Sequence, residues 1–139
     1  MTAAPKDVIL NARTGGTTDV PGVGAGDEVW FNSGDGNYYA TGSGSPFRPT
    51  PATAAQGSTP LGVIDAEDGN LIQLAPTFNV PAVGTGNNSA QHPAGTAHSV
   101  AVDAANNHVF VPLAANNAFP DCLTGCIAVF GRSPSKEDD

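Results

Sequence analysis

Short runs of β-forming residues alternate with clusters of turn-forming residues along the whole chain. No run keeps helical spacing over the ~10 residues that a helix would need. This pattern predicts an all-β protein built from many short strands. We expect these strands at residues 7–11, 28–31, 38–41, 61–65, 71–74, 99–103, 108–112 and 127–130.

Three of the expected strand pairs are separated by residues that accept a positive φ. Residues 34–36 read Gly-Asp-Gly, residues 68–70 read Asp-Gly-Asn, and residues 106–107 read Asn-Asn. These residue types are typical of tight hairpin turns. The strands on either side of each turn are therefore expected to pair antiparallel.

The chain contains an internal repeat. The segment DEVWFN starts at Asp27 and is followed by a turn and by NYYA, whereas HSVAVD starts at His98, at a spacing of 71, and is followed by a turn and by HVFV. Both halves resume after a long loop, with LGVID in the first and IAVFG in the second. A third, partial copy opens the chain, because residues 9–15 match residues 63–69 at a spacing of 54. Repeats of this length indicate a repeat architecture.

Each repeat unit reads as strand, tight turn, strand, long loop, strand, tight turn and a weak fourth strand. Four antiparallel strands per unit form the blade of a β-propeller. The segment GTAHSVAVDAANNHVFVPLA, together with the later GCIAVFGR, resembles the bacterial YVTN-type, lactonase-like propeller repeats. In that family a strand of the form xVAVD precedes a turn and an xVFV strand.

This resemblance covers residues 7 to 131 and implies a partial β-propeller over residues 1–132. The expected parts are a blade tail at 7–26, one blade at 27–76, another blade at 97–131, and a disordered acidic tail at 133–139. A propeller has typically four to eight blades, and isolated blades leave unpaired strand edges. We therefore expect a homo-oligomer, a fragment of a longer propeller, or pairing with other propeller blades.

Composition excludes several other classes. The 139 residues include 17 Gly and 12 Pro, which argues against a helical bundle. Five Lys and Arg stand singly against 13 Asp and Glu, giving a net charge of −8, so no basic patch suits nucleic acid. No apolar stretch approaches the ~20 residues of a membrane-spanning helix.

Two cysteines, Cys122 and Cys126, are separated by three residues. We expect a disulfide, because a closed zinc site needs four ligands and redox pairs more often have two intervening residues. A disulfide and few charges suit an extracytoplasmic protein, periplasmic or secreted. Charged residues interrupt the first fifteen positions, so this chain is expected to contain no signal peptide.

The propeller resemblance also implies a candidate metal centre. His98 falls at the start of an innermost strand, Asp27 is its counterpart in the other copy, and Glu28 lies beside Asp27. In the related NHL-type amidating lyases and gluconolactonase-like propellers, such channel positions bind a divalent metal, here Ca²⁺ or Zn²⁺. The alternative is that His98 and Asp27 join loops to strand ends by hydrogen bonds.

Aromatic residues suggest where the protein makes contacts. Those on expected strands are predicted to pack between blades, with sugar stacking as the alternative: Trp30, Tyr38, Tyr39, Phe110 and Phe130. Phe47 and Phe78 fall in expected loops, which makes them candidate binding residues. With no complete catalytic set, we predict a non-catalytic binding or assembly module. The alternative is a metal-dependent lyase or lactonase whose site includes His98 and Asp27.

Overall fold

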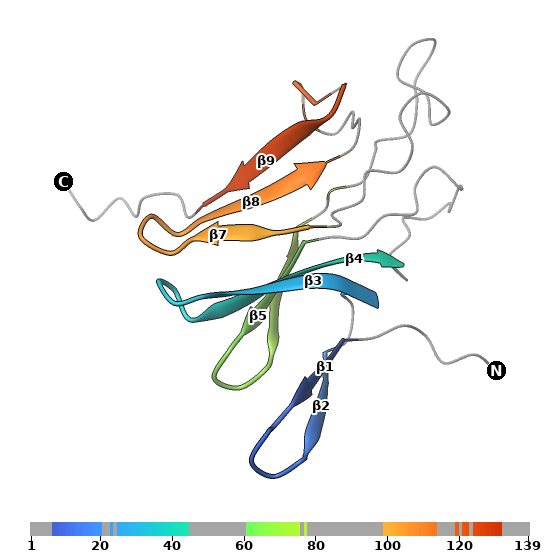
Figure 1. Ribbon diagram of the computed structural model, residues 1–139, viewed down its shortest axis with the longest axis vertical. Helices are drawn as coiled ribbons and strands as arrows, with labels where there is room; N and C mark the ends of the chain where they lie inside the picture. Colours follow the sequence, from blue (N-terminus) through green and yellow to red (C-terminus); the bar gives the residue numbers. More distant parts are fainter. Residues whose placement is uncertain are drawn as a thin grey trace.

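The computed structural model describes residues 7–20, 23, 25–44, 61–75, 77, 99–113, 119, 121–122 and 124–131. Every helix or strand within these residues is a β-strand, which confirms the all-β prediction (Figure 1). The strands are β1 Asp7–Leu10, β2 Thr17–Val20, β3 Ala25–Asn32, β4 Asn37–Gly44, β5 Leu61–Asp65, β6 Leu71–Ala75, β7 Ala101–Asp103, β8 His108–Leu113 and β9 Cys126–Phe130.

The nine strands form three antiparallel sheets, each with its strands in chain order. The first sheet is β1-β2, the central sheet is β3-β4-β5-β6, and the last sheet is β7-β8-β9. The position of β2 had no predicted counterpart, because Thr-Thr-Asp-Val has one strongly apolar residue and only Val20 is buried. Register shifts between Ala25 and Glu28 allow β3 to start before the predicted residue.

One turn design closes four of the hairpins. Each begins with an Asn or Asp whose side-chain Oδ1 accepts the backbone N–H two residues later: Asn11, Asn32, Asp65 and Asp103. The residue four places after the Asx has a positive φ: Gly15 at 74°, Gly36 at 76°, Gly69 at 75° and Asn107 at 53°. This combination is an Asx turn completed by a left-handed residue. Asp65 and Asp103, the last residues of β5 and β7, thus cap the turns that follow them.

The positions of these turns reproduce the repeat found in the sequence. Asn11 and Asp65 are matched by the spacing of 54, and Asn32 and Asp103 are matched by the spacing of 71. The hairpins β1-β2 and β5-β6 are therefore counterparts, as are β3-β4 and β7-β8. The repeat thus holds at the level of strands and turns.

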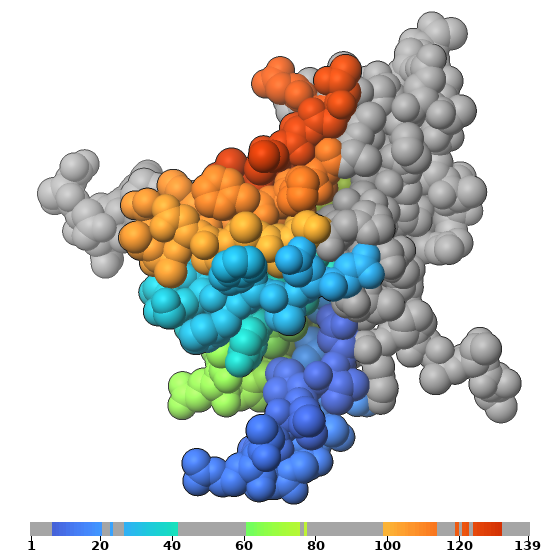
Figure 2. Space-filling view, in the orientation of Figure 1, coloured from blue at the N-terminus to red at the C-terminus, as the bar shows by residue number. Residues whose placement is uncertain are grey.

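The two inner strands of the central sheet, β4 and β5, have buried side chains on both faces. Side chains alternate between the faces of a strand, and Tyr39 and Leu61 pack on one face against the last sheet, in a cluster that includes Val109. On the opposite face, Ala40 and Ile64 pack against Val20 and Val23. The central sheet consequently lies between the other two, as the order of colours in Figure 2 illustrates.

Gly62 of β5 lies against Val23, which is between β2 and β3 in the chain. Gly62 pairs with Ala40, so a side chain at position 62 would point toward the first sheet. A Cβ at this position would lie 2.6 Å from Cγ2 and 3.0 Å from Cγ1 of Val23. Glycine at position 62 therefore allows Val23 to pack on this face of the central sheet.

We predict that Gly62→Ala lowers the free energy of unfolding by about 1–3 kcal/mol, because the added methyl overpacks a full interface. Urea denaturation measures this loss. Val23→Ala removes the colliding atoms, so Gly62→Ala should cost clearly less in that background. An equal cost in both backgrounds would show that the contact with Val23 is not the cause.

Candidate functional site

The structure places two of the three predicted metal ligands. Asp27 and Glu28 lie on β3, where Asp27 is exposed and Glu28 is partly buried. Glu28 Oε2 accepts a hydrogen bond from the backbone N–H of Val100 at 3.2 Å. This carboxylate therefore joins the central sheet to the chain just before β7.

His98, the third predicted ligand, lies outside the described residues, as do Phe47, Phe78 and residues 133–139. Within the part of the chain that the structure describes, no group of three or more His, Cys, Asp or Glu side chains could hold a metal ion. The metal centre of Asp27, Glu28 and His98 accordingly stays a prediction.

The turns of the two counterpart hairpins β3-β4 and β7-β8 lie on the same side of the molecule, at the left of Figure 1, and contact each other. Asn32 is fully buried, and its Nδ2 donates to Oδ1 of Asn107 at 3.1 Å. A Cβ on Gly34 would collide with the carbonyl oxygen of Ala104 and with the Asn107 side chain. These contacts fix the relative position of the two sheets near the exposed His108.

Tyr39 of β4 forms a hydrogen bond with the turn between β3 and β4. Its hydroxyl donates to Oδ2 of Asp35 at 2.6 Å, and Oδ1 of the same carboxylate accepts the backbone N–H of Asn37 at 3.1 Å. Burial, together with the hydrogen bond and the charge of Asp35, raises the pKa of Tyr39 to about 12. Its phenol therefore stays protonated well above its ordinary range.

We predict that the protein loses stability between pH 10 and about pH 12. The folded-state pKa of Tyr39 lies above the ordinary value of 10.0, so its contribution is complete below pH 10 and disappears as the pH rises through the folded value. Tyr39→Phe should cost about 1 kcal/mol at neutral pH and flatten this alkaline decline. Urea midpoints from pH 8 to 12 test both effects.

Tyr38→Phe is the matched control, because Tyr38 is the neighbouring, half-buried phenol on β4. The Tyr38 variant should keep the alkaline decline. A Tyr39 variant with the same decline as the unmodified chain would assign the decline to another group.

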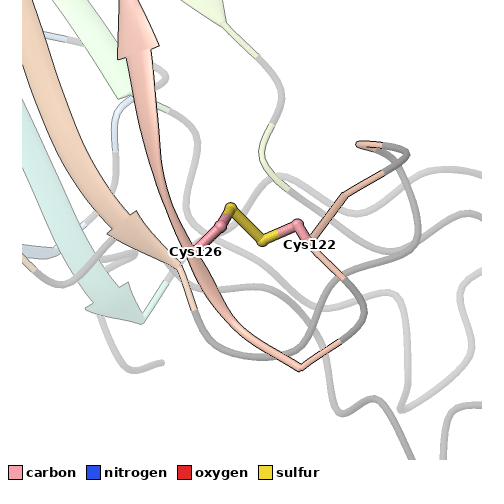
Figure 3. Close-up of a disulfide and its surroundings, with 2 residues drawn as sticks. All are labelled: Cys122 and Cys126. Atoms are coloured by element: carbon pink, nitrogen blue, oxygen red, sulfur yellow. A yellow bond between two sulfur atoms is a disulfide. The ribbon is translucent and has the colours of Figure 1, made fainter.

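A disulfide joins Cys122 to Cys126, the first residue of β9 (Figure 3). Cys122 is fully buried in the cluster between the central and last sheets. Its N–H donates to the carbonyl of Phe119, and the ring of Phe119 packs edge-on against Phe130 of β9 at 6.4 Å between centroids. The disulfide thus ties the segment before β9 to the core.

We predict that replacing both cysteines by alanine lowers the free energy of unfolding by about 2 kcal/mol, the loop-entropy value for so short a loop. Thermal or urea unfolding with and without reductant measures this loss. The double variant should be insensitive to reductant. If reduction leaves the unmodified chain's stability unchanged, the segment before β9 holds its conformation without the bond.

A groove of about 400 Å³ lies between β1 and the central sheet. We call it the β1 groove. Its apolar wall includes Ile9, Val29 and Tyr38, and acidic residues also line it, among them Asp7 and Asp27. Clefts of this size with apolar walls and a few polar groups are typical of binding sites.

Sequence reasoning missed the β1 groove. The run Val29-Trp30-Phe31 has apolar residues on both faces of β3, which favours a strand buried on both sides. In the structure Val29 is 61% exposed and Phe31 is 49% exposed. The available signal was the incomplete first repeat, which supplies only two strands to cover a four-stranded sheet.

No protein-family model, no curated protein and no solved structure matches this chain. The interpretation of its function therefore depends on the geometry described above.

Proposed function

We propose that this chain is a non-catalytic binding or assembly module of the β-propeller type, in which the three sheets are consecutive blades or parts of blades. The resemblance to YVTN-type, lactonase-like repeats motivates this proposal. The observation that carries it is the recurrence of one hairpin turn at the two repeat spacings, with each sheet packed face to face on the next.

Counterpart residues support a constant direction of packing from sheet to sheet. Ala40 faces the preceding, first sheet, and Val111, its counterpart in the later repeat, faces the preceding, central sheet. Ile9 faces the following, central sheet, and its counterpart Val63 faces the following, last sheet. Sheets that always use the same face toward the same neighbour are what a ring of blades requires.

The number of strands motivates the assembly part of the proposal. The described residues supply sheets of two, four and three strands, whereas a propeller has typically four to eight four-stranded blades. Further copies of this chain, or other blades, would complete the ring.

We also propose an extracytoplasmic location, which the Cys122–Cys126 disulfide supports. No helix in the described ranges is long and apolar enough to cross a membrane.

The metal-dependent lyase or lactonase is the alternative proposal. It needs Asp27 and His98 at one metal ion, with Glu28 available beside them. The bond from Val100 N–H to Glu28 favours the binding module, because it already uses one Glu28 oxygen.

Native mass spectrometry combined with elemental analysis tests the proposed function. We expect masses of whole-number multiples of the chain, ring-shaped particles by negative-stain electron microscopy, and no stoichiometric Ca²⁺ or Zn²⁺. A lone chain at every concentration would overturn self-assembly.

A bound divalent metal that is lost on His98→Ala, and retained on His108→Ala, would instead establish the metal centre. His108 is the matched control because it is exposed and lies on β8.

A further inference from the structure

We infer that the β1 groove and the free edge of β1 bind the edge strand β9 of a second copy, joining the copies head to tail. This inference rests on the proposed assembly function and names the two surfaces that make the contact.

The backbone of β1 has one paired edge and one free edge. The N–H of Asn11 donates to the carbonyl of Gly16, and the hydrogen-bonded pairs of an antiparallel ladder alternate. The backbone groups of Val8 and Leu10 therefore point away from β2. In the described part of the chain no strand pairs with this edge, so it is available for strand addition.

The counterpart of this edge in the central sheet is paired with a strand. The shorter repeat spacing matches Val8 and Leu10 with Gly62 and Ile64 of β5. These two residues of β5 pair with Ala40 and Tyr38 of β4. The free edge of β1 is thus the counterpart of an edge that is paired in the central sheet.

The wall of the β1 groove is the uncovered part of an interface that already exists. Val29 pairs with Ala40, and Phe31 pairs with Tyr38, so all four side chains share one face of the central sheet. The first sheet buries Ala40 on this face but leaves Val29 and Phe31 exposed. An added strand beside β1 would cover β3 and continue the same apolar interface.

The chain itself carries the surface that fits this wall. β9 ends the last sheet, and Ile127 and Val129 are 65% and 57% exposed on it. They pair with Pro112 and Phe110, whose face points away from the central sheet.

Phe110 is the counterpart of Tyr39 at the longer repeat spacing. Tyr39 lies on the face with which the central sheet packs on its following neighbour. The outer face of the last sheet therefore corresponds to the face with which the central sheet packs on its following neighbour. The wall of the β1 groove belongs to the face with which the central sheet packs on its preceding neighbour, and part of that face is uncovered. This match makes a second copy the occupant.

Charge shapes the expected association. β9 has no charged residue, so its insertion brings no additional negative charge beside Asp7 and Asp27. Two whole copies, each with a net charge of −8, still repel each other. Added salt screens this repulsion, so association should strengthen with ionic strength. Because different surfaces of each copy meet, the contact is heterologous and produces a ring or a chain of copies.

Sedimentation velocity on the full chain tests the inference, with samples up to about 1 mM so that weak contacts are seen. Val29→Glu in the groove and Val129→Glu on β9 should each weaken association at least about tenfold, because each places a charge in an apolar contact. Ile72→Glu is the matched control, because Ile72 is an exposed apolar residue on β6 outside both surfaces. It adds the same charge and should leave association within about twofold.

Leu10→Pro is a second groove-side variant. It removes an edge N–H that points away from β2, a position where an edge strand accepts proline. Circular dichroism melts identify any variant that fails to fold. Leu10→Pro should weaken association like Val29→Glu.

Mixing two defective variants tests the head-to-tail geometry. Val29→Glu keeps an intact β9, and Val129→Glu keeps an intact groove, so an equal mixture should form a dimer and nothing larger. No dimer in the mixture, or equal weakening by Ile72→Glu, would overturn the inference. If the wild-type chain assembles and neither Glu substitution weakens this assembly, the inference is overturned and the proposed function stands. A wild-type chain that stays single throughout would overturn the self-assembly part of the proposed function as well.

Discussion

The central sheet is apolar on both faces, and the rest of the structure depends on covering those faces. Tyr39 and Ala40 are neighbours on β4, yet both are buried because they pack against different sheets. Burial of apolar surface is the main driving force of folding. Since a strand sends alternate side chains to opposite faces, a sheet of this kind needs a neighbour on each side. Stacking of sheets is therefore a requirement of the sequence of the central strands.

The same requirement explains where apolar side chains stay exposed. The first sheet has two strands and covers only part of the central sheet, so Val29 and Phe31 on β3 are exposed beside the β1 groove. The last sheet has no neighbour on its outer face among the described residues, and Ile127 and Val129 are exposed there. Exposed apolar surface of this kind marks interaction sites. Exposed apolar side chains thus lie on β3 beside the β1 groove and on the outer face of the last sheet.

Local features of the fold were predictable from the sequence because short-range chemistry decides them. Asn32 and Asp103 begin turns that end in left-handed Gly36 and Asn107, and these residue types are favoured there whatever surrounds them. The two repeat spacings also matched each turn with its correct counterpart. β2 was harder, because a strand with one buried residue has almost no signal of its own and forms by pairing with β1. The candidate site was also predictable only in part. The sequence pointed to Glu28 as a polar strand residue, but it did not predict the hydrogen bond from the N–H of Val100.

By itself the sequence determined the all-β class, the positions of most strands, and the hairpin turns, since alternation and turn chemistry act over a few residues. Only the tertiary structure decided which faces are buried. Val29 and Val109 look alike as strand valines, but one is exposed and the other is buried, because burial depends on whether a sheet distant in sequence lies opposite. The β1 groove likewise exists because the two-stranded first sheet covers only part of the central sheet. No local pattern encodes it, and it became visible only once three sheets were placed together.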